Sequence, residues 1–222
     1  MEQMRIVSVN IGAAKSTTFR EKTRTSGIDK KPVGEPVFVG TNGLQGDVIC
    51  DQEVHGGIDQ AVYAYSADDY AWWADELGRE IPPGTFGENL TIAGLPTNVN
   101  AGERLLVGDV VLEATAPRIP CSKFAAQMRD SQFGIEFRRA QRPGTYFRVL
   151  NEGRVAAGDA VTFVDNPDCD VSMLDLFLFA FDSSPDVVDM ERMLEAPISV
   201  RMREKIQKKL NATVRTDEQT TI

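Results

Sequence analysis

Residues 102–109 read Gly102-Glu103-Arg104-Leu105-Leu106-Val107-Gly108-Asp109, an apolar run that ends in a Gly-Asp pair. Residues 153–159 repeat this layout as Gly153-Arg154-Val155-Ala156-Ala157-Gly158-Asp159. Because glycine followed by aspartate is typical of tight turns, each stretch predicts a strand, a turn and a further strand. Many short strands joined by such turns favour a closed or half-closed β-barrel.

Other segments upstream of residue 165 extend this mainly β pattern. Residues 5–9 alternate apolar and polar side chains, and residues 60–65 place two tyrosines on one face of a strand. Two helices are expected to interrupt the strands. One begins at Ser66 and ends near Gly78, and a shorter one begins at Pro120, because proline is favoured at the first helical position.

After residue 165 the chain changes from a strand pattern to a helix pattern. Ser172, Ser184 and Ser199 each precede an apolar residue repeat of helical spacing, so three helices are expected, followed by a frayed polar tail after Leu210. We therefore predict a mainly β domain with some α at residues 1–165 and a small three-helix bundle at residues 166–222. Such a bundle is marginal by itself and should pack on the barrel or on a second subunit.

Composition excludes several classes of function. The net charge of the 222 residues is −9, which disfavours nucleic acid as a partner. The chain has no apolar run long enough to span a membrane and no signal-peptide layout at its start, so a cytoplasmic location without a membrane partner is expected. The three cysteines are far apart, which argues against a disulfide framework, and Cys50 and Cys169 are interpreted as structural.

Cys121 has the most distinctive chemical surroundings of the three cysteines. It lies in Pro117-Arg118-Ile119-Pro120-Cys121-Ser122-Lys123, with a cation on each side and in the first turn of the predicted helix. Adjacent cations and the positive end of a helix dipole both favour a thiolate. The alternative is a packed cysteine that follows a proline-rich loop.

His55, the only histidine, opens the run His55-Gly56-Gly57-Ile58-Asp59. A single histidine cannot build a His-based metal cage, so its possible roles are hydrogen bonding, proton transfer or packing. The two glycines allow positive φ and can direct backbone amides at an anion. Asp59 could orient the imidazole or cap the following strand.

Three further segments give weaker signals. Gly87 permits a sharp turn before Glu88 and Asn89, whose groups suit the edge of a heterocycle, although this stretch taken alone is better explained by an ordinary loop. Lys30 could hold a phosphate or remain solvated. The basic run at residues 201–209 is interpreted as the solvated face of the third helix.

Taken in order, these motifs resemble the MOSC domain, the molybdenum cofactor sulfurase C-terminal domain family, and in particular its YiiM-type members with a C-terminal three-helix segment. The resemblance covers residues 5–210 and implies a β-barrel-like fold that binds the pyranopterin molybdenum cofactor (Mo-molybdopterin). It rests on five stretches: Gly43-Leu44-Gln45-Gly46-Asp47, His55 to Val62, Phe86-Gly87-Glu88-Asn89-Leu90, Gly108-Asp109 and Pro117 to Phe124.

The resemblance also implies roles for individual residues. Cys121 would give a thiolate ligand to molybdenum, which accepts soft sulfur donors. Lys30, Arg118 and Lys123 would hold the phosphate and dithiolene charge, with Asn89 at the pterin edge. The remaining expected pocket residues are His55, Gly56, Gly57, Asp59 and Gly87. Gln60 stands where family members usually have Lys or Arg, so this pocket should carry less positive charge.

The implied activity is reduction of small N-hydroxylated compounds such as hydroxylaminopurines, with Cys121 and His55 as catalytic residues and His55 as the proton donor. Because the sequence has no flavin, haem or iron–sulfur motif, electrons should come from a separate donor protein. Two alternatives remain open, a cofactor carrier without turnover and a sulfur-transfer protein with a Cys121 persulfide. The apolar helix at residues 172–181 could form a homodimer surface or pack on the barrel.

Overall fold

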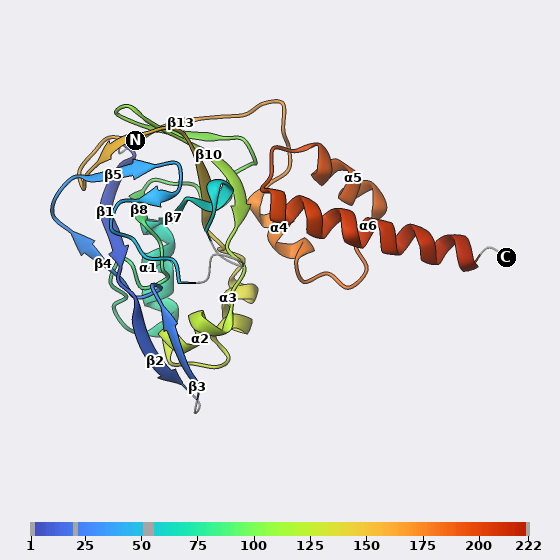
Figure 1. Cartoon of the computed structure of the whole chain (residues 1–222), viewed down its shortest axis with the longest axis horizontal. Helices are drawn as coiled ribbons and strands as arrows, with labels where there is room; N and C mark the ends of the chain where they lie inside the picture. Colours follow the sequence, from blue (N-terminus) through green and yellow to red (C-terminus); the bar gives the residue numbers. More distant parts are fainter. Residues whose placement is uncertain (1–2, 20–21, 51–55, 221–222) are drawn as a thin grey trace.

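Figure 1 shows a computed structural model of the chain, which describes residues 3–19, 22–50 and 56–220. Its centre is an eight-stranded sheet with the strand order β13-β9-β10-β11-β7-β8-β1-β4. Only β7 and β8 pair in parallel within it, and the other neighbours are antiparallel. The strands of this sheet are β1 Arg5–Gly12, β4 Lys30–Val33, β7 Val62–Ser66, β8 Leu90–Ala93, β9 Arg104–Val107, β10 Val110–Pro117, β11 Thr145–Asn151 and β13 Thr162–Val164.

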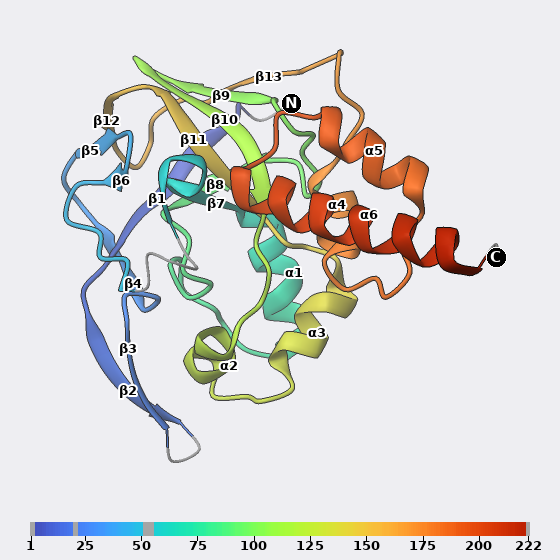
Figure 2. The same ribbon diagram turned by 45° about the vertical axis from the view of Figure 1, so that its right-hand side comes forward.

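Two smaller sheets accompany the large one. The hairpin of β2 (Lys15–Phe19) and β3 (Lys22–Ser26) extends away from the body of the molecule, as Figure 2 shows. A three-stranded sheet has the order β12-β5-β6, with bounds β12 Gly153–Val155, β5 Val37–Gly40 and β6 Gly43–Leu44.

The large sheet is curled but not closed, so the half-closed form of the predicted β-barrel is the one observed. β4 and β13 remain at its two edges. An isolated bridge between Arg5 and Ala160, with a hydrogen bond from Ile6 N to Asp159 O of 2.9 Å, brings the start of β1 beside the chain that leads into β13. The curl leaves a half-closed, barrel-like body with mixed α and β structure.

Three helices and one 3-10 turn are inserted between the strands: η1 Ile58–Gln60, α1 Ala67–Leu77, α2 Ser122–Met128 and α3 Phe133–Ala140. Helix α1 is capped by Ser66, which accepts from Asp68 N, and ends at left-handed Gly78, as predicted. Helix α2 begins at Ser122 rather than at Pro120. Helix α3 was not predicted, because its start at Phe133 has no side-chain cap to mark it.

The C-terminal segment forms the three expected helices, α4 Met173–Phe179, α5 Val187–Glu195 and α6 Val200–Thr220. A capping box of Ser172 and Asp175 starts α4, but α5 is capped by Asp186 instead of beginning at Ser184. The tail after Leu210, predicted to be frayed, continues α6, which leaves the body of the molecule in Figures 1 and 2.

The C-terminal helices share one apolar core with the sheet. Met173, Met190 and Ile206, one from each helix, are fully buried in the same cluster as Leu112 and Phe147 of the sheet. Burying each such side chain is worth roughly 1.5–3 kcal/mol, which is why the helices pack here. Packing within the chain thus accounts for the apolar face of α4.

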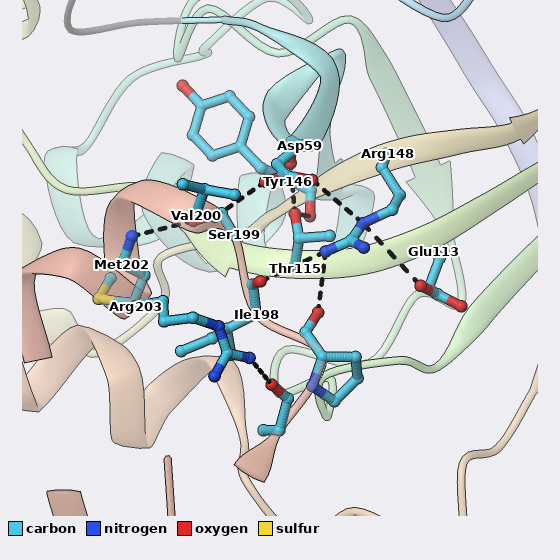
Figure 3. Close-up of polar contacts among 12 residues, drawn as sticks. Asp59, Glu113, Thr115, Tyr146, Arg148, Ile198, Ser199, Val200, Met202 and Arg203 are labelled. Carbon is cyan, nitrogen blue, oxygen red and sulfur yellow. Dashed lines mark hydrogen bonds and ion pairs between the residues drawn. The ribbon is translucent and has the colours of Figure 1, made fainter. Parts of the chain in front are cut away.

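Polar contacts fix the orientation of α6 on the sheet (Figure 3). Ser199 N donates to Thr115 O at 2.9 Å, and Val200 N donates to Asp59 Oδ2 at 2.8 Å. Arg148 Nη2 donates to the carbonyls of Pro197 at 3.1 Å and Ile198 at 3.3 Å. The first turn of α6 is therefore held by groups of η1, β10 and β11.

A second, aromatic cluster lies between the sheet and helices α1 to α3. Tyr65, Trp73, Phe86, Phe124 and Phe137 are all almost fully buried in it, with ring centroids about 5–6 Å apart. Because Phe86 directly precedes Gly87 and Phe124 lies in the first turn of α2, just after Cys121, this cluster fixes both segments. Within the described ranges, no helix is long and apolar enough to cross a membrane.

Candidate functional site

One cavity brings together most of the residues that the sequence singles out. It has about 600 Å³ of empty space, including the solvent at its mouth. Seven of the predicted site residues line it: Lys30, Gly56, Gly87, Asn89, Arg118, Cys121 and Lys123. Segments far apart in sequence thus form one pocket at the end of β10.

Arg118 places a buried positive charge in this cavity. It directly follows β10 and is only 6% exposed, with its guanidinium carbon 4.4 Å from the ring centroid of Phe124 and 5.3 Å from that of Tyr63. Among the described residues, its Nε has no hydrogen-bond partner. Burial lowers the pKa of Arg118, but Tyr146, Tyr63 and Cys121 outweigh this effect and raise it, so the side chain stays a cation. A buried cation with an unused donor is what an anionic ligand would complete.

Cys121 is the N-cap of α2 and not a residue of its first turn, which corrects the position predicted from Pro120. Its carbonyl accepts from Phe124 N at 3.0 Å and Ala125 N at 3.2 Å. The residue is half-buried and lines the cavity together with Arg118 and Lys123. The cations flanking Cys121 in sequence therefore also share its cavity in space, which favours thiolate chemistry.

Lys30 and Asn89 line the cavity, but their polar atoms are engaged within its wall. The Lys30 ammonium forms a buried ion pair with the Asp47 carboxylate, which also accepts from Asn89 Nδ2 at 2.9 Å. Asn89 Oδ1 accepts from Tyr63 N at 3.1 Å. Burial lowers the pKa of Lys30, and the Asp47 charge opposes this shift. These residues thus build the wall through Asp47, which belongs to a stretch that carries the resemblance but was not among the predicted pocket residues.

Gly87 provides the sharp turn expected of it. Its φ is +78°, and a Cβ at this position would lie 2.9 Å from Ile28 Cγ1 and 3.6 Å from Arg118 Nη1. A side chain here would therefore be strained and would press on the opposite wall of the cavity.

The glycine-rich run divides between two surfaces. His55 lies outside the described residues. Gly56 lines the cavity of Cys121, whereas Gly57 and Asp59 line a separate cavity beside α6. The Asp59 carboxylate accepts from Val200 N and lies 3.4 Å from Arg148 Nε, so the structure places it at the docking site of α6 and not in the Cys121 cavity.

Sequence reasoning missed several residues of the Cys121 cavity. Cys50, interpreted as structural, is exposed and lines this cavity, as do Tyr63 and Tyr146. Gln60 also lines it, in agreement with the position that the resemblance implied. The rings of Tyr63 and Tyr146 stack with their centroids 4.7 Å apart. The tyrosine alternation of residues 63 and 65 was visible in the sequence, but nothing near Cys50 distinguishes it from a packed thiol.

The described residues include no group of three or more His, Cys, Asp or Glu side chains placed to hold a metal ion. A metal in the Cys121 cavity would thus need most of its ligands from a cofactor, and a dithiolene-bearing cofactor supplies them. The soft thiol and the buried cation fit such a group.

Comparison with known proteins identifies the family. A family model described as the MOSC domain matches residues 51–162, just over half of the chain. The chain belongs to the MOSC domain family. The protein YflK of Bacillus subtilis is 31% identical over 210 residues, which cover 94% of this chain and 95% of YflK.

Other MOSC relatives agree with this placement. YiiM of Escherichia coli is 28% identical over 178 residues, covering 78% of this chain and 79% of YiiM. The crystal structure of YiiM from Geobacillus stearothermophilus has a TM-score of 0.76 at 31% identity, and covers 93% of this chain and 99% of that one. A protein of Gibberella moniliformis named a reductase is 33% identical over 148 residues, but the match covers only 26% of its length.

Proposed function

We propose that this MOSC protein binds the molybdenum cofactor in the Cys121 cavity and reduces small N-hydroxylated compounds in the cytoplasm. The observation that carries the proposal is the pairing, in one cavity, of the Cys121 thiol with the buried Arg118 guanidinium and its unused Nε. A thiolate suits molybdenum, and a buried guanidinium suits the phosphate or dithiolene charge of the cofactor. A relative named a reductase supports an oxidoreductase class.

The residues of the chain divide the work as follows. Cys121 holds the metal, Arg118 and Lys123 offset the negative charge of the ligand, and the stacked Tyr63 and Tyr146 form an aromatic wall. When bound, the cofactor supplies the two-electron chemistry that breaks the N–O bond. The net reaction takes two electrons and two protons, and it yields the amine and water. The electrons come from a separate donor protein, and His55 is proposed to deliver a proton.

The proposal is tested by metal content. Protein purified from a host that makes the molybdenum cofactor is expected to carry close to one molybdenum per chain, and Cys121→Ala to lose at least about fivefold because the thiolate ligand is gone. Cys169→Ala, a half-buried cysteine outside the cavity, is the matched control and should keep its molybdenum.

Other outcomes favour the two alternatives. Protein without molybdenum but with cyanide-releasable sulfur on Cys121 would indicate a persulfide carrier. Protein that binds molybdenum but never reduces an N-hydroxylated base, with any electron donor, would indicate a cofactor carrier.

For His55, we expect His55→Ala to lower the reduction rate about 10²-fold or more, the usual contribution of a general acid, and to remove a pH dependence near neutrality. Reduction rates measured from pH 5 to 9 check this, with molybdenum content as the control for intact binding. An unchanged rate and pH profile would exclude His55 as the proton donor.

A further inference from the structure

Residues 56–60 form a wall between two cavities. On one side is the cavity of Cys121, and on the other is a cavity lined by the start of α6, including Ser199, Val200 and Arg201. Gly56 and Gln60 line both cavities. Any group that holds these two residues from the α6 side therefore also shapes the wall of the candidate cofactor pocket.

Arg201 is such a group. Its Nη1 donates to Gly56 O at 2.6 Å and to Gln60 Oε1 at 2.9 Å. A Cβ on Gly57 would lie 3.8 Å from Arg201 Nη2, so the guanidinium also lies beside Gly57. The preceding residue, Val200, donates its N–H to Asp59, as Figure 3 shows. The first turn of α6 thus holds residues 56, 59 and 60 together.

The contact with Arg201 fixes the orientation of the Gln60 side chain. A carboxamide carries an acceptor oxygen on one corner and two N–H donors on the other, whereas a guanidinium can only donate. Arg201 therefore holds Oε1 on the α6 side and directs the Nε2 donors away from itself. Gln60 also lines the Cys121 cavity, so a ligand bound there would lie beside this side chain.

We infer that Gln60 donates a hydrogen bond from Nε2 to an anionic group of the ligand in the Cys121 cavity, and that Arg201 of α6 is its positioning residue. The inference rests on the proposed function only in taking this ligand to be anionic. The charge in the cavity points the same way, since Arg118 and Lys123 line it and Arg118 Nε is an unused donor among the described residues. On this account the C-terminal helices are part of the binding site.

The test uses the full-length, ligand-free protein and pyrophosphate as the probe. The alkylation rate of Cys121 by iodoacetamide is followed by mass spectrometry of its peptide, with the Cys169 peptide as the internal reference. Pyrophosphate is expected to slow alkylation of Cys121 in the unchanged protein. Gln60→Glu keeps an acceptor for Arg201 but loses the donors, so it should need at least about tenfold more pyrophosphate for the same protection.

Arg201→Met releases the Gln60 amide and should need about fivefold more pyrophosphate. In Gln60→Met the donor is already gone, so adding Arg201→Met should raise the required pyrophosphate concentration little further. The effects of the two substitutions are then not additive, whereas a purely structural role of Arg201 would make them additive. Arg203→Met is the matched control, because the Arg203 guanidinium binds the carbonyls of Leu194 and Ala196 within the helical segment. In this control, pyrophosphate should protect Cys121 at the same concentration as in the unchanged protein.

Three results would overturn the inference: no protection of the unchanged protein, equal protection in Gln60→Glu, or additive effects of the two substitutions. Molybdenum content separates this failure from failure of the proposed function. If the unchanged protein carries molybdenum but Gln60→Glu is protected equally, the proposed function stands and the role of Gln60 is excluded. If the protein carries no molybdenum but shows the expected protection pattern, the role of Gln60 stands and the proposed function is excluded.

Discussion

An Arg118→Met variant is expected to bind the molybdenum cofactor about a hundredfold more weakly than the unchanged protein. The variant should unfold at a similar or higher temperature. Arg118 as a residue is only 6% exposed, so its hydrogen bonds to an anion form away from competing water. Losing two or so charge-assisted hydrogen bonds of this kind costs roughly 3 kcal/mol, or about two orders of magnitude in affinity.

The expected stability of this variant has a different physical reason. In the ligand-free protein, burial of the Arg118 charge is offset by the rings of Phe124 and Tyr63, but Nε has no partner within the described part of the chain. Methionine fills similar volume without a charge to desolvate, and replacing buried ionic groups by apolar ones is often neutral or stabilising. Molybdenum per chain and thermal unfolding of the ligand-free protein measure the two effects.

Arg139→Met, an exposed arginine of α3, is the control and should alter neither measurement. If Arg118→Met instead kept its molybdenum and unfolded at a much lower temperature, Arg118 would be a structural residue. The proposed anion site would then lose its main support.

Arg142→Met is expected to lower the free energy of unfolding by about 3 kcal/mol at neutral pH, at the lower end of what breaking a buried ion pair costs. Its partner is Asp69 of α1, whose side chain is 1% exposed and also accepts from Thr97 Oγ1 at 2.8 Å. The Arg142 side chain is 27% exposed and stacks over Trp72 with its guanidinium carbon 4.6 Å from the ring centroid. The lower figure reflects this partial solvation.

The pH dependence of the loss has a definite sign. Burial raises the pKa of Asp69, and the hydrogen bonds from Thr97 and Arg142 oppose that shift, so removing Arg142 should raise the pKa further. A carboxyl group with a raised pKa in the fold favours the folded state when protonated and loses that advantage as pH rises through the folded pKa. The deficit of Arg142→Met should therefore be largest at neutral pH and shrink under acid.

Urea unfolding at pH 5 and pH 8 measures this difference. The double variant Asp69→Asn with Arg142→Met removes the uncompensated charge and should recover part of the stability at pH 8. Equal losses at both pH values would show that Arg142 stabilises through its packing on Trp72 alone.

Local signals account for what the sequence predicted well. Helix α4 begins at its capping box and α1 ends at Gly78, because caps and left-handed glycines act within one turn of the residues that supply them. Helix α5 lacked a correct start because Asp186 and Ser184 are both good caps, and the choice between them depends on packing. Helix α3 lacked any cap and was missed for that reason.

The candidate site divides in the same way. By itself, the sequence determined that Cys121 stands between two cations and that the loops at Gly56-Gly57 and Gly87 contain glycine. Each of these features involves residues that lie within a few positions of each other. Only the tertiary structure decided that Cys50 lines the cavity, that Asp59 serves α6, that Lys30 is paired with Asp47, and that Arg201 reaches Gln60. These contacts join residues 17 to 141 positions apart, and a contact of that kind depends on how the sheet curls and where the helices dock on it.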